Sequence, residues 1–326
     1  MSEAPTRDVS DAGADDVVLP FAVEPLDLRG RIVRLGPSID RILSRHGYPA
    51  PVARLLGEAA AATALLGAAL KFEGRFQLQA RTDGVVDMLV VDFEAPDKLR
   101  AFARFDAGRL RAATSVGHDG PTQLMGQGHL ALTIDPGGDM ARYQGVVKLD
   151  GETLEQAAHR YFAQSEQIPT VVRLAVAQSV TGAGVHWRAG GLLAQFLPDS
   201  PERRRQAELH PGDAPAGAAV AEHVEDDAWA EAKALVGTVE DHELVDPTVS
   251  SERLLYRLFH ERGVKVFAPQ AIVDSCRCSR ERVATMLRRF TPQERADMIG
   301  DNGRIGVTCE FCSTHQDFDP AEFGGE

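Results

Sequence analysis

The four cysteines of this 326-residue chain are the feature that most restricts its fold. Cys276 and Cys278 form a C-x-C pattern, Cys309 and Cys312 form a C-x-x-C pattern, and all four fall within 37 residues. Four thiolates offered as two close pairs are a usual ligand set for tetrahedral zinc, which ties two separate turns together. The segment therefore predicts a single four-cysteine site in a small C-terminal domain.

Disulfides are the other chemistry that clustered cysteines serve, and they persist in oxidising compartments. The N-terminal stretch MSEAPTRDVSDAGADD is acidic and polar, unlike a secretory signal, so we expect a cytoplasmic chain with reduced thiols. Soft thiolates in a tetrahedral set favour zinc, at one ion per chain, with an iron–sulfur cluster as the alternative. His315 is a candidate substitute ligand, although a surface histidine is the expected interpretation. C-x-C is less common in purely structural zinc sites, which suggests a further role.

Charge and missing motifs exclude several function classes. A net charge of -13 argues against nucleic acid as a partner. The most apolar stretch, residues 59–70, is shorter than the roughly twenty residues of a membrane span, so we expect no membrane partner. The chain has no nucleotide-binding glycine loop, nucleophile elbow or H-E-x-x-H motif, and four thiolates leave zinc no open position. We therefore expect no enzyme. The arginines near Cys276 are interpreted as balancing the thiolate charge, with a local basic patch as the alternative.

The residue patterns predict an α+β fold with an N-terminal antiparallel sheet domain packed with helices. Residues 38–46 and 51–70 have helical patterns, and TLEQAAHRYFAQSEQIP from Thr153 has a capping box and an amphipathic stripe. Alternating apolar residues around Asp83-Gly84 and around DPGGD predict two hairpins. A helical, metastable linker and a small C-terminal zinc-binding domain complete the fold. The predicted parts are an acidic disordered tail (1–18), the N-terminal domain (19–198), the linker (199–262) and the zinc domain (263–326).

The linker combines charge with apolar residues. Residues 199–219 are rich in Pro, Gly, Ala and charge, as expected of a hinge. Residues 221–246 carry nine acidic groups against one lysine, yet contain Trp229 and several aliphatic residues. Such a segment folds only if another part of the chain covers its apolar side, so we expect conditional folding. We consider the metal domain as that cover for residues 221–259.

The sequence resembles the redox-regulated heat-shock holdase family of about thirty-three kilodaltons. CRCSRERV, CEFCSTH, YQGVVKLDGETLEQAAHRYFAQSEQIPT, GGLLAQFLP and LLYRLFHERGVKVFAPQ resemble motifs of this family in its order, over roughly residues 19–318. The resemblance implies an ATP-independent chaperone that is inactive when reduced and zinc-bound. It further implies that oxidation pairs Cys276 with Cys278 and Cys309 with Cys312, releases zinc and unfolds the linker. The opened protein then binds unfolding clients, commonly as a homodimer, at a surface that the sequence does not identify.

Physical considerations agree with this resemblance, and two other functions remain as alternatives. Losing a metal that contributes on the order of 10 kcal/mol should unfold so small a domain. A disulfide between residues two apart is strained, so it should be easily reduced again. A structural zinc adaptor or nucleic-acid-binding protein would instead have a redox-insensitive site. A thiol–disulfide oxidoreductase would turn over small disulfides, although no βαβ pattern surrounds the C-x-x-C motif.

Overall fold

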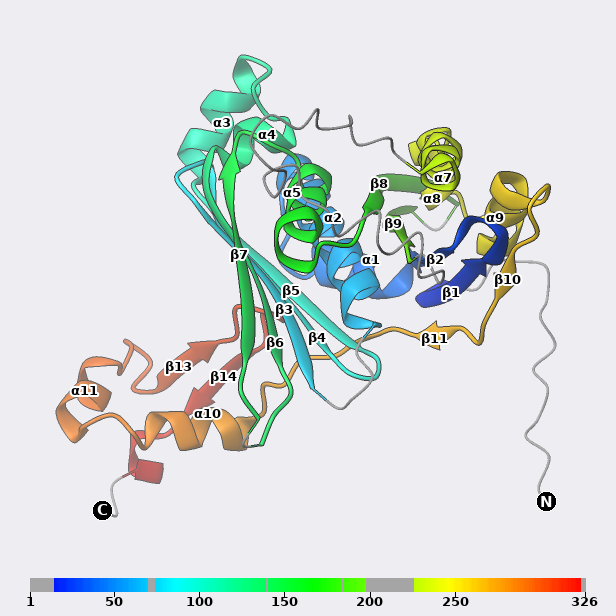
Figure 1. Cartoon of the computed structure of the whole chain (residues 1–326). Helices are drawn as coiled ribbons and strands as arrows, with labels where there is room; N and C mark the ends of the chain where they lie inside the picture. The colour runs from blue at the N-terminus through cyan, green and yellow to red at the C-terminus, as the bar shows by residue number, and fades with distance from the viewer. Residues whose placement is uncertain (1–14, 70–73, 139, 183, 198–225, 324–326) are drawn as a thin grey trace, which may run out of the picture.

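The computed structural model describes residues 15–69, 74–138, 140–182, 184–197 and 226–323. Within these ranges the chain forms two six-stranded sheets, with helices between and beside them, and a small C-terminal module (Figure 1). The predicted α+β class is confirmed. The hinge predicted at residues 199–219 and most of the predicted N-terminal tail lie outside the described residues.

The first sheet has the order β10-β1-β2-β9-β8, with β11 also paired to β1. All its pairings are antiparallel. Strand β1 begins at Val17, so the last residues of the predicted tail belong to the folded structure. Its strands are β1 Val17–Val23, β2 Leu28–Leu35, β8 Thr170–Thr181, β9 Gly184–Phe196, β10 Lys265–Val266 and β11 Gln270–Ala271.

The second sheet has the order β12-β5-β4-β3-β6-β7. Both predicted hairpins are present, as β3–β4 and β6–β7, and only the β12–β5 pair is parallel among its described pairings. The predicted antiparallel character is therefore confirmed. Its strands are β3 Arg75–Thr82, β4 Val86–Glu94, β5 Lys98–Phe105, β6 Gln127–Asp135, β7 Tyr143–Asp150 and β12 Val273–Asp274.

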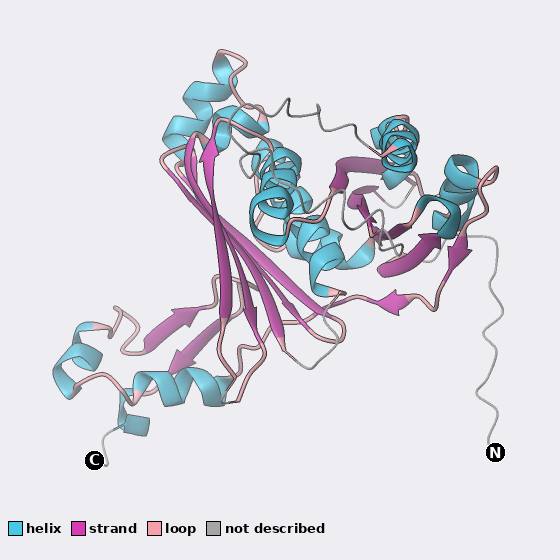
Figure 2. Cartoon of the chain, viewed as in Figure 1, coloured by secondary structure: helices cyan, strands magenta, loops and turns pink. Residues whose placement is uncertain are grey.

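Helices α1, α2 and α5 lie between the two sheets, whereas α3 and α4 lie at one end of the second sheet (Figure 1 and Figure 2). Helix α2 is buried on nearly every side, not only on the single face that its sequence pattern predicts. Small residues allow the neighbouring strands to pack closely around α2. A Cβ atom at Gly67, for example, would lie 2.5 Å from the Phe93 ring. The capping box at Thr153 is confirmed at the start of α5. The helices are α1 Pro37–Ser44, α2 Ala50–Gly67, α3 Ala107–Ser115, α4 Pro121–Met125 and α5 Leu154–Tyr161.

Three linker helices cover the opposite face of the first sheet. They are α7 Asp227–Gly237, α8 Asp241–Val245 and α9 Ser251–Phe259. Their buried residues, including Trp229 and Leu255, form one apolar cluster with strand residues such as Phe21 and Leu192. The idea that the metal domain covers the apolar side of residues 221–259 is wrong, because the buried linker residues pack against the first sheet and the C-terminal module has a separate cluster. Among the described residues, no helix is long and apolar enough to cross a membrane.

A strap, residues 265–274, leads from the linker helices to the C-terminal module (Figure 1). It pairs with β1 through β10 and β11 and then with β5 through β12. The module contains α10 Arg280–Leu287, α11 Pro292–Asp297, β13 Ile305–Thr308 and β14 His315–Phe318. Its apolar cluster has few fully buried members, which are Ala284, Leu287, Ile305, Phe318 and Phe323. A cluster of this size is too small to stabilise an independent domain.

Candidate metal centre and its docking surface

The four cysteines come from two loops of the C-terminal module. Cys276 and Cys278 lie between β12 and α10, and the side chain of Ser279 starts α10 directly afterwards by accepting from the Arg282 amide. Cys309 and Cys312 lie in the turn between β13 and β14. The Cys309 amide donates to the Thr314 carbonyl, and its own carbonyl accepts from Ser313, which closes this turn.

The four sulfur atoms lie within 4.8 Å of one another. Cys276 Sγ is 3.7 Å from Cys309 Sγ, and Cys278 Sγ is 3.2 Å from Cys312 Sγ. Zinc–sulfur bonds of about 2.3 Å in a tetrahedron place sulfur atoms about 3.8 Å apart. Disulfide sulfurs would be about 2.05 Å apart, so the structure contains four free thiols. Their arrangement fits a tetrahedral metal ion, as predicted from the spacing.

The protein environment affects the thiols unequally. Burial and hydrogen bonds with Cys312 and Cys276 raise the pKa of the Cys278 thiol. Burial also raises the pKa of Cys309. At Cys312, burial is outweighed by hydrogen bonds with the Thr314 hydroxyl and amide and with Cys278 and Cys276, which lower its pKa to about 6. The C-x-x-C turn therefore lowers the pKa of one of its thiols, and thiolates are the form that metals bind and oxidants attack.

The nearby charged residues are engaged in structural contacts. Arg277 Nε lies 2.5 Å from Glu94 Oε2, and Arg280 contacts the Asp317 carbonyl, Glu322 and the Phe318 ring. The described contacts of Arg277 and Arg280 hold the structure of the module, and their balancing of the thiolate charge stays a prediction. His315 is exposed and bonds to Thr308 and Asp317, which agrees with its interpretation as a surface histidine.

Phe311, one of the two residues between Cys309 and Cys312, docks the module on the N-terminal domain. The Phe311 ring meets Phe102 of β5 edge to face at 4.8 Å, and the Arg100 guanidinium lies 3.9 Å from its centre. The Phe311 carbonyl is 3.2 Å from His46 Nε2, and Ser313 Oγ is 2.9 Å from His46 Nδ1. The turn that holds the C-x-x-C motif therefore contacts the second sheet and the loop after α1.

A second contact holds the start of the module. Asp274, in β12, is almost fully buried and pairs with Arg45 and Arg41 at the end of α1. The sequence analysis missed all of these docking residues, because their partners lie more than 200 positions away in the chain. An aromatic residue between two metal-binding cysteines was the available signal, since a solvent-exposed turn has no need of one.

The fold and the site define a two-part protein, in which a small tetrathiolate module is docked on a larger α+β domain. The family profile described as "Hsp33 protein" matches residues 16–319. The chain is 46% identical to a 33 kDa chaperonin of Caulobacter vibrioides, over 94% of this chain and 95% of that one. It is 37% identical to a 33 kDa chaperonin of Shewanella woodyi, over 92% and 91%.

A solved structure shows the same fold. The 33 kDa chaperonin (heat shock protein 33 homolog) of Thermotoga maritima superposes with a TM-score of 0.72, at 20% identity, over 95% of this chain and 97% of that one. The chain belongs to the Hsp33 family. This confirms the resemblance identified from the sequence. The family is one of chaperones and not of enzymes, so the chain is a stress-related chaperone with a four-cysteine site able to hold a metal ion.

Proposed function

We propose that this chain is a redox-regulated, ATP-independent holdase. One observation carries the proposal: the helices that cover an apolar sheet face continue directly, through the strap, into the four-cysteine module. Unfolding of the four-cysteine module therefore releases the C-terminal end of the linker helices that cover this face. The reduced, metal-bound chain is the closed form, and the oxidised chain is the open one.

Zinc, at one ion per chain, is the metal that four cysteine sulfurs in this arrangement fit best. When bound, it would keep the four thiols deprotonated and hold the two loops together. The chain's own residues contribute the small cluster around Leu287 and Phe318 and the turn around Cys309. This cluster needs the metal for its stability, since structural zinc contributes on the order of 10 kcal/mol.

Oxidation converts the four thiols to two disulfides. Each disulfide forms as two thiolates give two electrons to one hydrogen peroxide, which takes up two protons from the solvent and becomes two water molecules. We propose the pairs Cys276–Cys278 and Cys309–Cys312. Within each pair the sulfurs lie within 4.8 Å, so bond formation needs only a local movement. The shortest contacts in the reduced structure run between the loops instead, and peptide mapping of the oxidised protein distinguishes the two pairings.

Release of the linker then exposes the surface that binds clients. The covered face of the first sheet is rich in Leu, Ile, Val and Phe side chains. A contiguous apolar surface of this kind binds unfolded chains. We assign client binding and dimerisation to residues 19–198, the switchable cover to residues 199–262 and the redox switch to residues 263–326. We propose a cytoplasmic protein that forms homodimers when oxidised and has neither nucleic acid nor membrane as a partner.

The test follows metal release and client protection on one sample. Peroxide is added at elevated temperature, a chromogenic chelator reports zinc, and light scattering reports aggregation of a heat-unfolded client. We expect about one zinc per chain to leave before protection begins, and a thiol reductant to reverse both. A parent sample without peroxide is the control, and a Cys276→Ser, Cys278→Ser double variant, which lacks two metal ligands, should protect the client without peroxide. Zinc that stays bound, or leaves without protection, would support the structural zinc adaptor instead.

A further inference from the structure

Two arginines are buried in the face of the first sheet that the linker covers. Arg34 of β2 is 1% exposed and Arg188 of β9 is 9% exposed. On the same face of their strands lie the apolar residues Ile32 and Leu192. A buried charge is costly unless it is paired and hydrogen-bonded. These side chains therefore need specific partners.

Their partners are main-chain carbonyl groups at the end of α8. Arg34 Nη2 donates to the Glu243 carbonyl at 2.6 Å, and Arg34 Nη1 donates to the Asp246 carbonyl at 2.8 Å. Arg188 Nε donates to the Val245 carbonyl at 2.6 Å. Three of four consecutive carbonyls are thus bound by guanidinium groups of the sheet.

The fourth carbonyl meets a glycine. Gly190 lies directly opposite Arg34 in the register of β2 and β9. A Cβ atom at Gly190 would be 2.1 Å from the Leu244 carbonyl oxygen, so only glycine permits this approach. The last four carbonyls of a helix lack partners within it and carry the negative end of its dipole. Arg34, Gly190 and Arg188 together accommodate all four.

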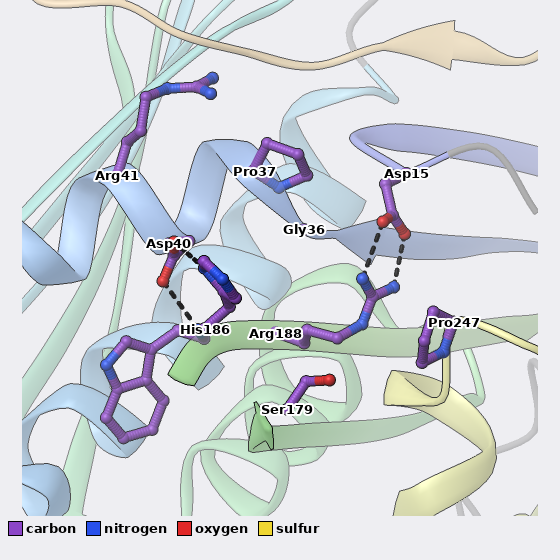
Figure 3. A pocket seen from close by; sticks show the side chains of 10 residues that line it. Asp15, Gly36, Pro37, Asp40, Arg41, Ser179, His186, Arg188 and Pro247 are labelled. Atoms are coloured by element: carbon purple, nitrogen blue, oxygen red, sulfur yellow. Dashed lines mark hydrogen bonds and ion pairs between the residues drawn. The ribbon is translucent and has the colours of Figure 1, made fainter. Parts of the chain in front are cut away.

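The terminal nitrogens of Arg188 bind the carboxylate of Asp15. They donate to its two oxygens, as Figure 3 shows. This ion pair borders a cavity of about 430 Å³ that Pro247, just after α8, also lines. Arg188 thus binds the Val245 carbonyl of α8 and the carboxylate of Asp15, which precedes β1, at the same time.

We propose that Arg34, Gly190 and Arg188 form a receptor for the main-chain carbonyls of a helix C-terminus. In the closed chain α8 occupies it. After the linker leaves, the receptor takes helix C-termini of partly folded clients. The client part rests on the proposed function, whereas the α8 part does not. Because every helix ends in unpaired carbonyls, the receptor needs no particular client sequence, and the neighbouring apolar face supplies the remaining contact area.

The first experiment tests the closed state of the reduced, zinc-loaded full chain by hydrogen exchange. Arg34→Met removes the donors while keeping a long side chain, and Gly190→Ala keeps both arginines but adds a methyl group against the Leu244 carbonyl. Both should speed amide exchange in α8 at least tenfold. Arg31→Met is the matched control, because Arg31 lies on the same strand, faces the other side and donates no described hydrogen bond to α8. Equal exchange in all three variants and the parent overturns the receptor.

The second experiment tests the open state with two fluorescent peptides and the oxidised full chain. One peptide has the sequence of residues 226–246 and ends there as an amide. The other continues with a helical Ala-Ala-Lys-Ala turn, which pairs the same carbonyls within the peptide. We expect the oxidised chain to bind the first at least tenfold more tightly, a difference of about 1.4 kcal/mol. Arg34→Met should remove this preference, and Arg31→Met should keep it.

The outcomes separate this inference from the proposed function. If the oxidised parent chain protects clients but binds both peptides equally, the helix-end receptor is overturned for clients and the holdase function stands. If the oxidised parent neither protects clients nor binds either peptide, the proposed function is refuted, and with it the client part of the receptor. The hydrogen-exchange experiment on the reduced chain then tests the remaining part, which is the binding of α8. Circular dichroism of each variant checks that the N-terminal domain is folded.

Discussion

Removing the Phe311 side chain should undock the cysteine module without changing its metal ligands. The edge-to-face contact with Phe102 contributes about 1 kcal/mol, and the contact with the Arg100 guanidinium about another 1 kcal/mol, for rings in these positions. A loss of about 2 kcal/mol raises the undocked population roughly thirtyfold. The His46 contact with the main-chain carbonyl of Phe311 can remain after Phe311→Ala.

Limited proteolysis of the reduced, zinc-loaded protein measures this population, because an undocked module leaves the strap exposed to cleavage. We expect Phe311→Ala to be cut in residues 265–274 roughly ten to thirty times faster and to lose zinc sooner under peroxide. Met286→Ala, which shortens an exposed side chain of the same module, is the control. If Phe311→Ala and the parent are cut at equal rates, the aromatic contact does not hold the module.

Three further changes probe the metal site, the cover and a buried carboxyl. Cys312→Ser should remove most of the roughly 10 kcal/mol that the metal contributes. The amides of α10 should then exchange hydrogen as fast as in an unfolded peptide, and slow exchange in the variant would contradict this prediction. Leu255→Asp puts a charge at a fully buried position of the cover. It should protect clients without peroxide, whereas Tyr256→Asp, at an exposed neighbour, should still require it. Burial and the carboxylates of Glu155 and Asp241 raise the pKa of Glu58 from 4.5 to about 7. Between these two pKa values the folded chain keeps a proton on Glu58 that the unfolded chain loses. The free energy of unfolding therefore falls as the pH rises from 4.5 to about 7, by at most about 3 kcal/mol. Urea unfolding at pH 5 and pH 8 should show that Glu58→Gln abolishes this slope.

Local signals in the sequence predicted the elements that local chemistry determines. The capping box at Thr153 starts a helix because its side chains bond within one turn. The turn at Asp83 and Gly84 joins two alternating strands for the same reason. The four cysteines identified the metal centre because metal ligands must converge, whatever lies between them.

Contacts between distant segments were not predictable from a single sequence. Arg34 stands in an apolar strand, and its carbonyl partners lie 209 and 212 residues away. Nothing near Arg34 in the chain indicates that it is buried. The burial of α2 was equally unpredictable. Its alanines are buried on nearly all sides because strands of both sheets pack against the helix, and these strands lie elsewhere in the sequence. The linker was predicted as conditionally folded, but the surface that covers it belongs to strands far along the chain.

The separation of the apolar clusters determines how the protein can return to its starting state. In the cluster that surrounds α2, Ile272 is the one described member that follows residue 226. The N-terminal part therefore keeps nearly all of its interior when the last hundred residues come apart. Under the proposed function, refolding after reduction would therefore take place on a folded N-terminal part whose central core stays buried. A protein assembled in this way could be opened and closed repeatedly without new synthesis.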